Sequence, residues 1–280
     1  KNLICSIHPY SSKSVKFASQ KRDAVMKYDH KLFQGKTLAI LSGGGDTPAI
    51  NSSIEAIRNR ASLLGFKVYG VLQGWKGLLG DGNIVDLTNQ PYDGYYGGTA
   101  LRSSRTNPFP SAKNPESRVP QVLKNFQRYK IDVLVTIGGD DTNGAAKRLF
   151  ETEGIPVIGF PKTIDNDLRT RTIHHFNGKD IEAVLCPGFP SAARVVMETA
   201  ASLKTTAESH SRILVLEVMG RDAGWLTGSA IFGGAQLGLI PEFEITRERK
   251  EVFFETVKEA YMHSRKKCLK IGRASCRERV

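Results

Sequence analysis

The sequence predicts an α/β protein, in one large or two modest domains, with mostly parallel sheets covered by helices. Short apolar runs alternate with segments that have a helical apolar period, which is typical of parallel strands joined by crossover helices. Several of these runs end directly in glycine and aspartate. The chain is also long enough, at 280 residues with 40% hydrophobic content, to bury a large core.

The first predicted elements follow a polar, basic extension at residues 1–35. Residues 37–42 form an apolar run that indicates a buried parallel strand. Pro48 suits the first turn of a helix, Gly65 ends that helix, and residues 67–71 form the next strand. The apolar stripe of the helix consists of Ile50, Ile54, Ile57 and Leu64.

The same alternation continues along the chain. Helices are expected at 119–129, 143–150, 191–206 and 252–263, and strands at 133–137, 155–159 and 213–218. In such sheets ligands bind beyond the carboxyl ends of the strands. Three segments rich in glycine and aspartate occupy those positions.

The net charge of +12 is concentrated at the two ends of the chain. Residues 1–36 contain eight Lys/Arg and two Asp, and residues 265–280 contain seven Lys/Arg and one Glu. The stretch between them is neutral, whereas a nucleic-acid-binding domain would have its basic patch on the folded body. We therefore expect no nucleic-acid partner.

Hydropathy and cysteine spacing favour a cytoplasmic protein. No apolar run approaches the roughly 18–20 residues of a membrane helix, so no membrane partner is expected. The amino-terminal segment lacks the apolar centre of a signal peptide. The four cysteines form no C-x-x-C pair, which favours reduced thiols over a metal site.

The first glycine-rich segment is Ser42-Gly-Gly-Gly-Asp-Thr-Pro48, between a predicted strand and a helix. Glycines there, including Gly44 and Gly45, let backbone N–H groups approach phosphate oxygens, and the helix amino terminus favours negative charge. It matches neither a Walker A loop nor G-x-G-x-x-G. A tight structural turn is the alternative.

The second segment, Gly138-Gly-Asp-Asp-Thr142, has the same arrangement. Adjacent carboxylates repel each other unless a cation or hydrogen-bond donors compensate. Asp140 is therefore a candidate ligand of Mg²⁺, with water completing the coordination. The alternative for Asp141 or Thr142 is a helix N-cap.

The third segment, Gly159-Phe-Pro-Lys-Thr-Ile-Asp-Asn-Asp167, is the most informative. One aspartate can accept a hydroxyl proton, another can hold metal, and Lys162 can neutralise phosphate oxygens. An Asx-rich turn would explain the acids but not the lysine. Arginines near other glycine turns could clamp a phosphorylated substrate; they are Arg102, Arg105, Arg212 and Arg221.

Together these segments resemble the 6-phosphofructokinase family, from about Leu38 to His263 and in the family's order. The matching residues are Ser42–Pro48, Gly97-Gly-Thr99, Arg105, Gly138-Gly-Asp140, Thr163–Asp167, Ser209-His-Ser-Arg212 and Met219-Gly-Arg221. The resemblance implies the family's fold, two Rossmann-like lobes with mostly parallel sheets covered by helices, here incomplete. It also implies phosphoryl transfer to the 1-hydroxyl of fructose 6-phosphate, giving fructose 1,6-bisphosphate in glycolysis.

The resemblance also implies roles for individual residues. Asp165 would be the general base, with Arg105 beside the transferring phosphate and Asp140 on Mg²⁺. Thr163 and Asp167 would support the substrate and the metal. Gly44 and Gly45 would line the donor site. Fructose 6-phosphate would contact Met219, Gly220 and Arg221, and its 6-phosphate would contact Arg212, which reaches a neighbouring subunit in bacterial tetramers. A homo-oligomer, dimer or tetramer, is therefore expected.

The donor is inferred from Asp141 and Lys162, where ATP-using members typically have glycine. This pair resembles the pyrophosphate-dependent branch, pyrophosphate–fructose 6-phosphate 1-phosphotransferase. A carboxylate at position 141 would repel a nucleotide α-phosphate, and the Lys162 ammonium would offset charge on pyrophosphate. The alternatives are an ATP-dependent 6-phosphofructokinase and a non-catalytic subunit of a hetero-oligomer.

The resemblance divides the chain into a phosphoryl-donor lobe at 36–185 and a sugar-phosphate lobe at 186–264, with an insertion from Leu168 to Cys186. The second lobe is expected to be incomplete, because the family's later sugar-phosphate residues are missing. Residues 265–280 lack an apolar period and are expected to be a non-native basic tail. We therefore expect the 280-residue chain to be truncated, and unstable or inactive by itself.

Overall fold

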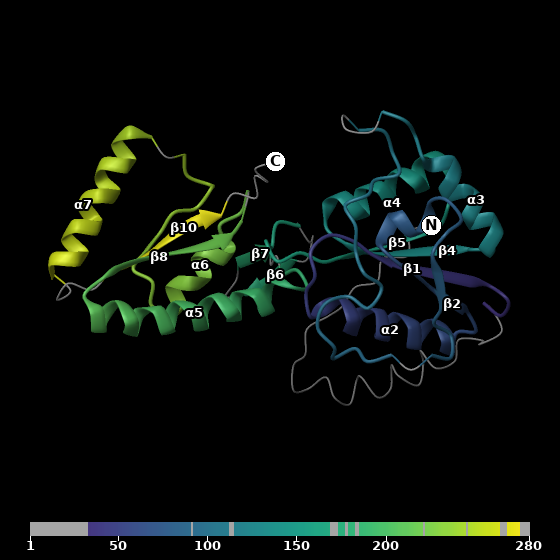
Figure 1. Ribbon diagram of the computed structural model, residues 1–280, viewed down its shortest axis with the longest axis horizontal. Helices are drawn as coiled ribbons and strands as arrows, with labels where there is room; N and C mark the ends of the chain where they lie inside the picture. The colour runs from purple at the N-terminus through teal and green to yellow at the C-terminus, as the bar shows by residue number, and fades with distance from the viewer. Residues whose placement is uncertain are drawn as a thin grey trace.

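The computed structural model describes residues 33–90, 92–111, 115–168, 173–176, 179–182, 185–220, 222–244, 246–263 and 268–274. Two lobes lie end to end (Figure 1). The first lobe, up to residue 168, surrounds a five-stranded sheet, and the second lobe, from residue 185 on, contains a three-stranded sheet. A short hairpin, β6 (Ile173–Phe176) and β7 (Lys179–Glu182), lies between them.

The sheet of the first lobe has the strand order β3-β2-β1-β4-β5. All neighbours pair in parallel except β3, which is antiparallel to β2. The strands are β1 (Thr37–Ser42), β2 (Lys67–Val71), β3 (Ile84–Asp86), β4 (Val133–Gly138) and β5 (Val157–Pro161). Because β1 is central, all six of its residues are buried.

Helices cover both faces of this sheet (Figure 1). They are α2 (Ala49–Leu63) on one face, and α3 (Val119–Tyr129), α4 (Asp140–Glu153) and the 3-10 helix η1 (Gly74–Leu78) on the other. Successive side chains of a strand point to opposite faces. Leu38 and Ile40 of β1 therefore pack in the cluster with α2, while Ala39 and Leu41 pack in the cluster with α3 and α4.

The sheet of the second lobe has the order β8-β10-β9, with parallel pairing. Its elements are α5 (Phe189–His210), β8 (Ile213–Met219), α6 (Trp225–Phe232), β9 (Leu237–Gly238), α7 (Arg247–His263) and β10 (Cys268–Ala274). One apolar cluster joins α5, α6 and β8, and includes Ala200, Val218, Leu226 and Ala230.

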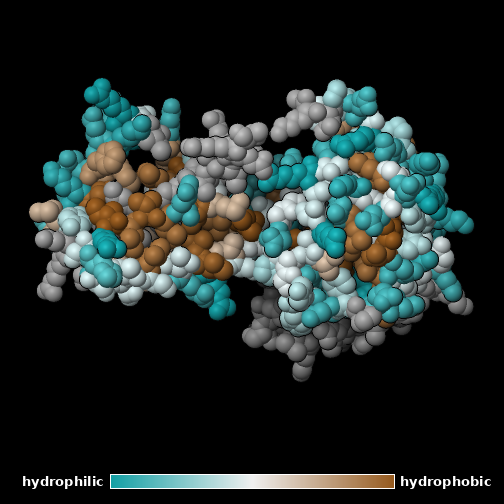
Figure 2. Space-filling view, viewed as in Figure 1, coloured by the Kyte–Doolittle hydropathy of each residue, from teal (hydrophilic) through white to brown (hydrophobic). Residues whose placement is uncertain are grey.

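Much apolar surface of the second lobe faces outward (Figure 2). Val215 of β8 is 65% exposed, Phe232 of α6 is 82% exposed, and Phe254 of α7 is 61% exposed. In β8 only Val218 is buried. Among the described residues, the sheet of this lobe is therefore packed less completely than that of the first lobe.

The predicted fold class is confirmed, with shifts at several boundaries. The helix expected at 143–150 begins at Asp140, so Asp140 and Asp141 occupy its first turn, where the helix dipole favours negative charge. The strand expected at 155–159 runs from 157 to 161. The helix expected at 191–206 is longer at both ends, and the helix expected at 252–263 begins earlier, at Arg247. The pattern of apolar residues missed η1, α6 and the β6–β7 hairpin.

The expected tail at 265–280 differs from the structure over residues 268–274. These residues form β10, which pairs with β8 along seven positions and with β9. Hydrogen bonding along a strand does not require an apolar period, which explains why the sequence pattern missed it. No helix among the described residues is both long and apolar enough to span a bilayer.

Candidate active site

Three loops meet at the carboxyl edge of the first sheet. They are the glycine loop (residues 43–46) after β1, the start of α4 after β4, and the strand-end segment (residues 162–167) after β5. The Gly43 N–H donates to the Ile137 carbonyl at 2.9 Å, and the Lys162 N–H donates to the Gly138 carbonyl at 2.9 Å. These backbone bonds fix the three loops relative to one another.

Close packing explains the glycines at Gly43 and Gly138. A Cβ atom at Gly43 would overlap the Thr142 hydroxyl, and one at Gly138 would lie 2.6 Å from Thr142 Cβ. Thr142 is buried, and its carbonyl accepts a hydrogen bond from Trp75 Nε1 at 3.3 Å. The start of α4 is therefore held between the glycine loop and the indole ring.

Lys162 links the strand-end segment to the glycine loop. Its side chain is only 4% exposed, and Nζ donates to the Gly45 carbonyl at 2.5 Å. Burial lowers the pKa of Lys162, while the negative charges of Asp46 and Asp165 act in the opposite direction. The structure therefore brings Lys162 together with Gly44 and Gly45, as expected for a common anion site.

The turn that follows Lys162 is fixed by its own side chains. Thr163 Oγ1 donates to Asp167 Oδ1 at 3.0 Å and accepts from the Asp165 N–H at 3.1 Å. Asn166 has a positive φ of 55° and is 2% exposed, and its Oδ1 accepts from the Cys186 N–H at 2.9 Å. This geometry holds Asp165 half-buried and Asp167 exposed at the sheet edge.

Asp140 and Asp141 are exposed in the first turn of α4. In this described helix the N-cap is Gly139 and no side chain makes a capping hydrogen bond, so the alternative that Asp141 or Thr142 is the N-cap is wrong. The two carboxylates are thus available at the same edge as the glycine loop.

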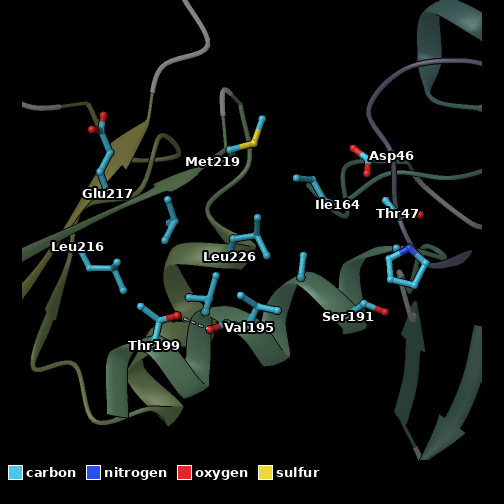
Figure 3. Close-up of a pocket in the computed structure, with 15 residues that line it drawn as sticks. Asp46, Thr47, Ile164, Ser191, Val195, Thr199, Leu216, Glu217, Met219 and Leu226 are labelled. Carbon is cyan, nitrogen blue, oxygen red and sulfur yellow. Dashed lines mark hydrogen bonds between the residues drawn. The ribbon is translucent and has the colours of Figure 1, made fainter. Parts of the chain in front are cut away.

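A cavity of about 500 Å³ lies between the two lobes (Figure 3). The first lobe contributes Asp46, Thr47 and Ile164, and the second lobe contributes α5 and the end of β8. Met219 lies across the cavity from Asp46 and Ile164, and Leu216 and Leu226 form its apolar wall. The cavity therefore has polar side chains at the glycine loop and a largely apolar wall in the second lobe, where Ser191, Thr199 and Glu217 are polar.

The remaining predicted site residues differ in how close they lie to the cavity. Arg105 is exposed in the segment between β3 and α3, and Gly220 is buried with a φ of 146° beyond β8. Arg212 is exposed immediately before β8, seven residues from Met219, which corresponds to about 23 Å along a strand. The structure does not bring Arg212 to the cavity of the same chain. Arg221 lies outside the described residues.

Sequence reasoning missed Asp46, Thr47 and Ser191 as cavity residues. Asp46 and Thr47 belong to the first glycine-rich segment, Ser42–Pro48. Their position just before Pro48, at the start of a helix, could have indicated that they face a ligand site. Ser191 lies in the first turn of α5 and carries no local pattern that distinguishes it. Its place in the cavity depends on how α5 packs, which local sequence does not encode.

Parallel strands, glycine loops and a convergent lysine and carboxylates define an α/β protein with a candidate anion site at a sheet edge. The family model described as Phosphofructokinase matches residues 37–275. The chain therefore belongs to the phosphofructokinase family.

Some curated relatives are named for pyrophosphate as the phosphoryl donor, and others are named for ATP. The chain is 40% identical over 210 residues to a protein from Dictyoglomus thermophilum named pyrophosphate–fructose 6-phosphate 1-phosphotransferase, covering 74% of this chain and 56% of that protein. It is 39% identical over 219 residues to an ATP-dependent 6-phosphofructokinase from Chloroflexus aggregans, covering 76% and 58%. The chain thus spans a little over half the length of these relatives.

Solved structures support the fold. A pyrophosphate-dependent phosphofructokinase from Marinobacter aquaeolei matches with a TM-score of 0.66 and 25% identity, covering 85% of this chain and 60% of that one. The phosphofructokinase from Pichia pastoris in the T-state matches with a TM-score of 0.72 and 19% identity, covering 93% and 29%. The latter likeness concerns the fold alone.

Proposed function

We propose that the protein of this chain transfers a phosphoryl group from pyrophosphate to the 1-hydroxyl of fructose 6-phosphate, giving fructose 1,6-bisphosphate. The observation that best supports this proposal is the buried ammonium of Lys162 at the glycine loop, with Asp165 three residues further along. We also propose that the reaction is a reversible step of glycolysis in the cytoplasm.

In the proposed mechanism Asp165 accepts the proton of the 1-hydroxyl as its oxygen attacks the terminal phosphorus of pyrophosphate. The bridging P–O bond breaks and inorganic phosphate leaves. Lys162, whose Nζ already contacts the Gly45 carbonyl, offsets negative charge on the donor and on the leaving phosphate. Gly44 and Gly45 provide a backbone without side chains at the same anion site.

The proposed choice of donor rests on Asp141 and Lys162. Asp141 is exposed in the first turn of α4, where its carboxylate would repel the α-phosphate of a nucleotide. Pyrophosphate has no group in that place. ATP is the second candidate donor, because relatives named as ATP-dependent are 38–39% identical to this chain.

The carboxylates at the proposed site are suitable ligands for Mg²⁺. Among the described residues no group of three or more His, Cys, Asp or Glu could hold a metal alone. Mg²⁺ is commonly bound by one or two carboxylates plus phosphate oxygens and water, so the exposed Asp140 suits it. When bound, Mg²⁺ would neutralise developing charge on the phosphates.

For the sugar phosphate we propose the cavity between the lobes. Thr163, Asp165 and Asp167 would contact the reacting end, Arg105 would lie beside the transferring phosphate, and Met219 would pack against the sugar, with Gly220 and Arg221 beside it. Because Arg212 lies far along β8 from Met219, it would serve the site of a neighbouring subunit in a homo-oligomer.

The test is a binding measurement, because turnover is proposed for a whole protein and this chain spans 56% of one relative. Pyrophosphate and ATP are titrated separately into the chain by calorimetry with Mg²⁺. We expect clear binding of pyrophosphate and at least tenfold weaker binding of ATP. Equal or tighter binding of ATP would contradict the proposed donor.

A matched pair of variants separates the two donor residues. Asp141→Gly should improve ATP binding, because it removes a repelling carboxylate. Lys162→Gly should weaken pyrophosphate binding, because it removes the ammonium. If the ratio of ATP affinity to pyrophosphate affinity is unchanged in both variants, the ATP-dependent alternative is favoured instead.

A further inference from the structure

Arg102 has an unusual backbone conformation next to the glycine loop. Its φ is 58°, in the left-handed region that non-glycine residues seldom adopt. Four other non-glycine residues in the described part of the chain have a positive φ. Lys130 and Ser211 are C-caps of α3 and α5, where this conformation is common. Arg102 terminates no helix of the described chain, so its conformation needs another explanation.

The surrounding hydrogen bonds impose this conformation. The Arg102 N–H donates to the Thr99 carbonyl at 3.0 Å, and the Arg102 carbonyl accepts from Ser42 Oγ at 3.1 Å. On either side, the Gln73 N–H donates to the Leu101 carbonyl at 2.8 Å, and Ser104 Oγ donates to the Gln73 carbonyl at 2.7 Å. The backbone at position 102 is therefore fixed whatever side chain it carries.

The same contacts place Arg102 beside the anion site. Ser42 is the last residue of β1, and Ser103 Oγ donates to the Gly44 carbonyl at 2.5 Å. A side chain that starts between Ser42 and Gly44 starts at the edge of the glycine loop. Arg102 is exposed, and among the described residues no hydrogen bond or ion pair of its guanidinium is found.

A position that would suit glycine is thus occupied by a long, permanently charged side chain. Strained backbone of this kind persists where the neighbouring structure determines it, and it is frequent at functional sites. Guanidinium groups bind phosphate through two parallel hydrogen bonds, which a lysine cannot reproduce. We propose that Arg102 is an additional pyrophosphate-binding residue at the edge of the glycine loop.

This inference rests on the proposed pyrophosphate donor. It assigns Arg102 to binding of the donor and not to proton transfer. The strain and the charge at position 102 have separable effects, because glycine removes both and alanine removes only the charge. The two effects can therefore be measured independently.

The experiment compares Arg102→Gly, Arg102→Ala and Arg102→Lys with the unmodified chain. Pyrophosphate is titrated by calorimetry with Mg²⁺, and thermal unfolding is followed without ligand. We expect Arg102→Gly and Arg102→Ala to bind pyrophosphate about tenfold more weakly, and Arg102→Lys to lie between them and the unmodified chain. Arg102→Gly should melt about 2–4 °C higher than Arg102→Ala, because only glycine relieves the strain.

Arg194→Ala is the matched control, since Arg194 is an exposed arginine of α5 in the second lobe. It should leave pyrophosphate binding unchanged. If the unmodified chain binds pyrophosphate and Arg102→Gly binds it equally well, the role of Arg102 is refuted and the proposed donor stands. If the unmodified chain does not bind pyrophosphate, both proposals are refuted.

Discussion

The central strand of the first lobe and the first strand of the second lobe differ sharply in burial. All six residues of β1 are buried, because α2 covers one face and α3 and α4 cover the other. In β8 only Val218 is buried, and Val215 is 65% exposed. Both strands end in a glycine-containing motif. The residues proposed for the donor therefore lie on a fully packed scaffold, whereas those proposed for the sugar do not.

The largest expected effect of this difference is on stability. Leu41→Ala in β1 removes a fully buried side chain and should lower the free energy of unfolding by about 2–5 kcal/mol. Val215→Ala in β8 should change it by less than about 0.5 kcal/mol, because its side chain is mostly in water. Urea unfolding of both variants measures the two values.

Equal losses in the two variants would show that β8 is as well packed as β1. Amide hydrogen exchange offers an independent check, since residues with few buried contacts open more often. Amides of β8 should exchange faster than those of β1 and β4. Slower exchange in β8 would reverse the comparison.

The second prediction concerns where pyrophosphate binds. Lys162→Met removes a buried ammonium at the glycine loop and should weaken pyrophosphate binding by about 10–100-fold. Met219 lies across the cavity on the second lobe, so Met219→Ala should change the affinity for pyrophosphate by no more than about threefold. Calorimetric titration in Mg²⁺ measures both. A larger effect of Met219→Ala would move the donor site to the second lobe.

The third prediction compares two glycines of one loop. Gly43→Ala places a methyl group against the Thr142 side chain and should cost about 1–3 kcal/mol of stability. Gly45→Ala meets no atom within 4 Å, so its stability should be nearly unchanged. Urea unfolding measures the stability of both variants. Equal stabilities would mean that the start of α4 shifts at little cost to accommodate the added methyl group.

The smallest expected effect is a shift in the titration of Lys162. Asp46→Asn removes one of the two negative charges that support its ammonium, so the pKa of Lys162 should fall further below 10.5. Amine-specific labelling at a series of pH values, followed by mass spectrometry, measures that pKa. Asp93→Asn, at an exposed aspartate outside the cavity, is the control and should leave it unchanged.

The same lowered pKa has a consequence for stability. As the pH rises through the folded-state pKa toward the ordinary value of 10.5, the unfolded chain binds more protons at this site than the folded one. The Lys162 contribution to the free energy of unfolding should therefore increase with pH in that window. Lys162→Met should remove this increase, as thermal melts at several alkaline pH values would show.

Much of the first lobe could be predicted from local pattern. The boundaries of β1 and β2 match the expected 37–42 and 67–71, because buried parallel strands are continuous apolar runs. The grouping of Gly45 and Lys162 also followed from the rule that ligands bind at strand ends. The non-catalytic alternative is not favoured by the relatives' names.

Long-range packing accounts for what pattern missed. Asp46 and Ser191 line one cavity only because the start of α5 lies near the glycine loop in the folded chain, and β10 is a strand through its pairing with β8. The strain at Arg102 is likewise invisible in the sequence, since it arises from hydrogen bonds to Ser42 and Thr99. Such features depend on contacts between distant segments.

The hydrogen bond from Trp75 to Thr142 has a spectroscopic consequence. The chain has two tryptophans, one in each lobe: Trp75 is 3% exposed, and Trp225 is 52% exposed. A buried indole emits at shorter wavelength than one in water, so their fluorescence can be separated. Because the Trp75 indole contacts the helix turn that contains Asp141, its emission can signal events at the proposed anion site while Trp225 signals the state of the second lobe.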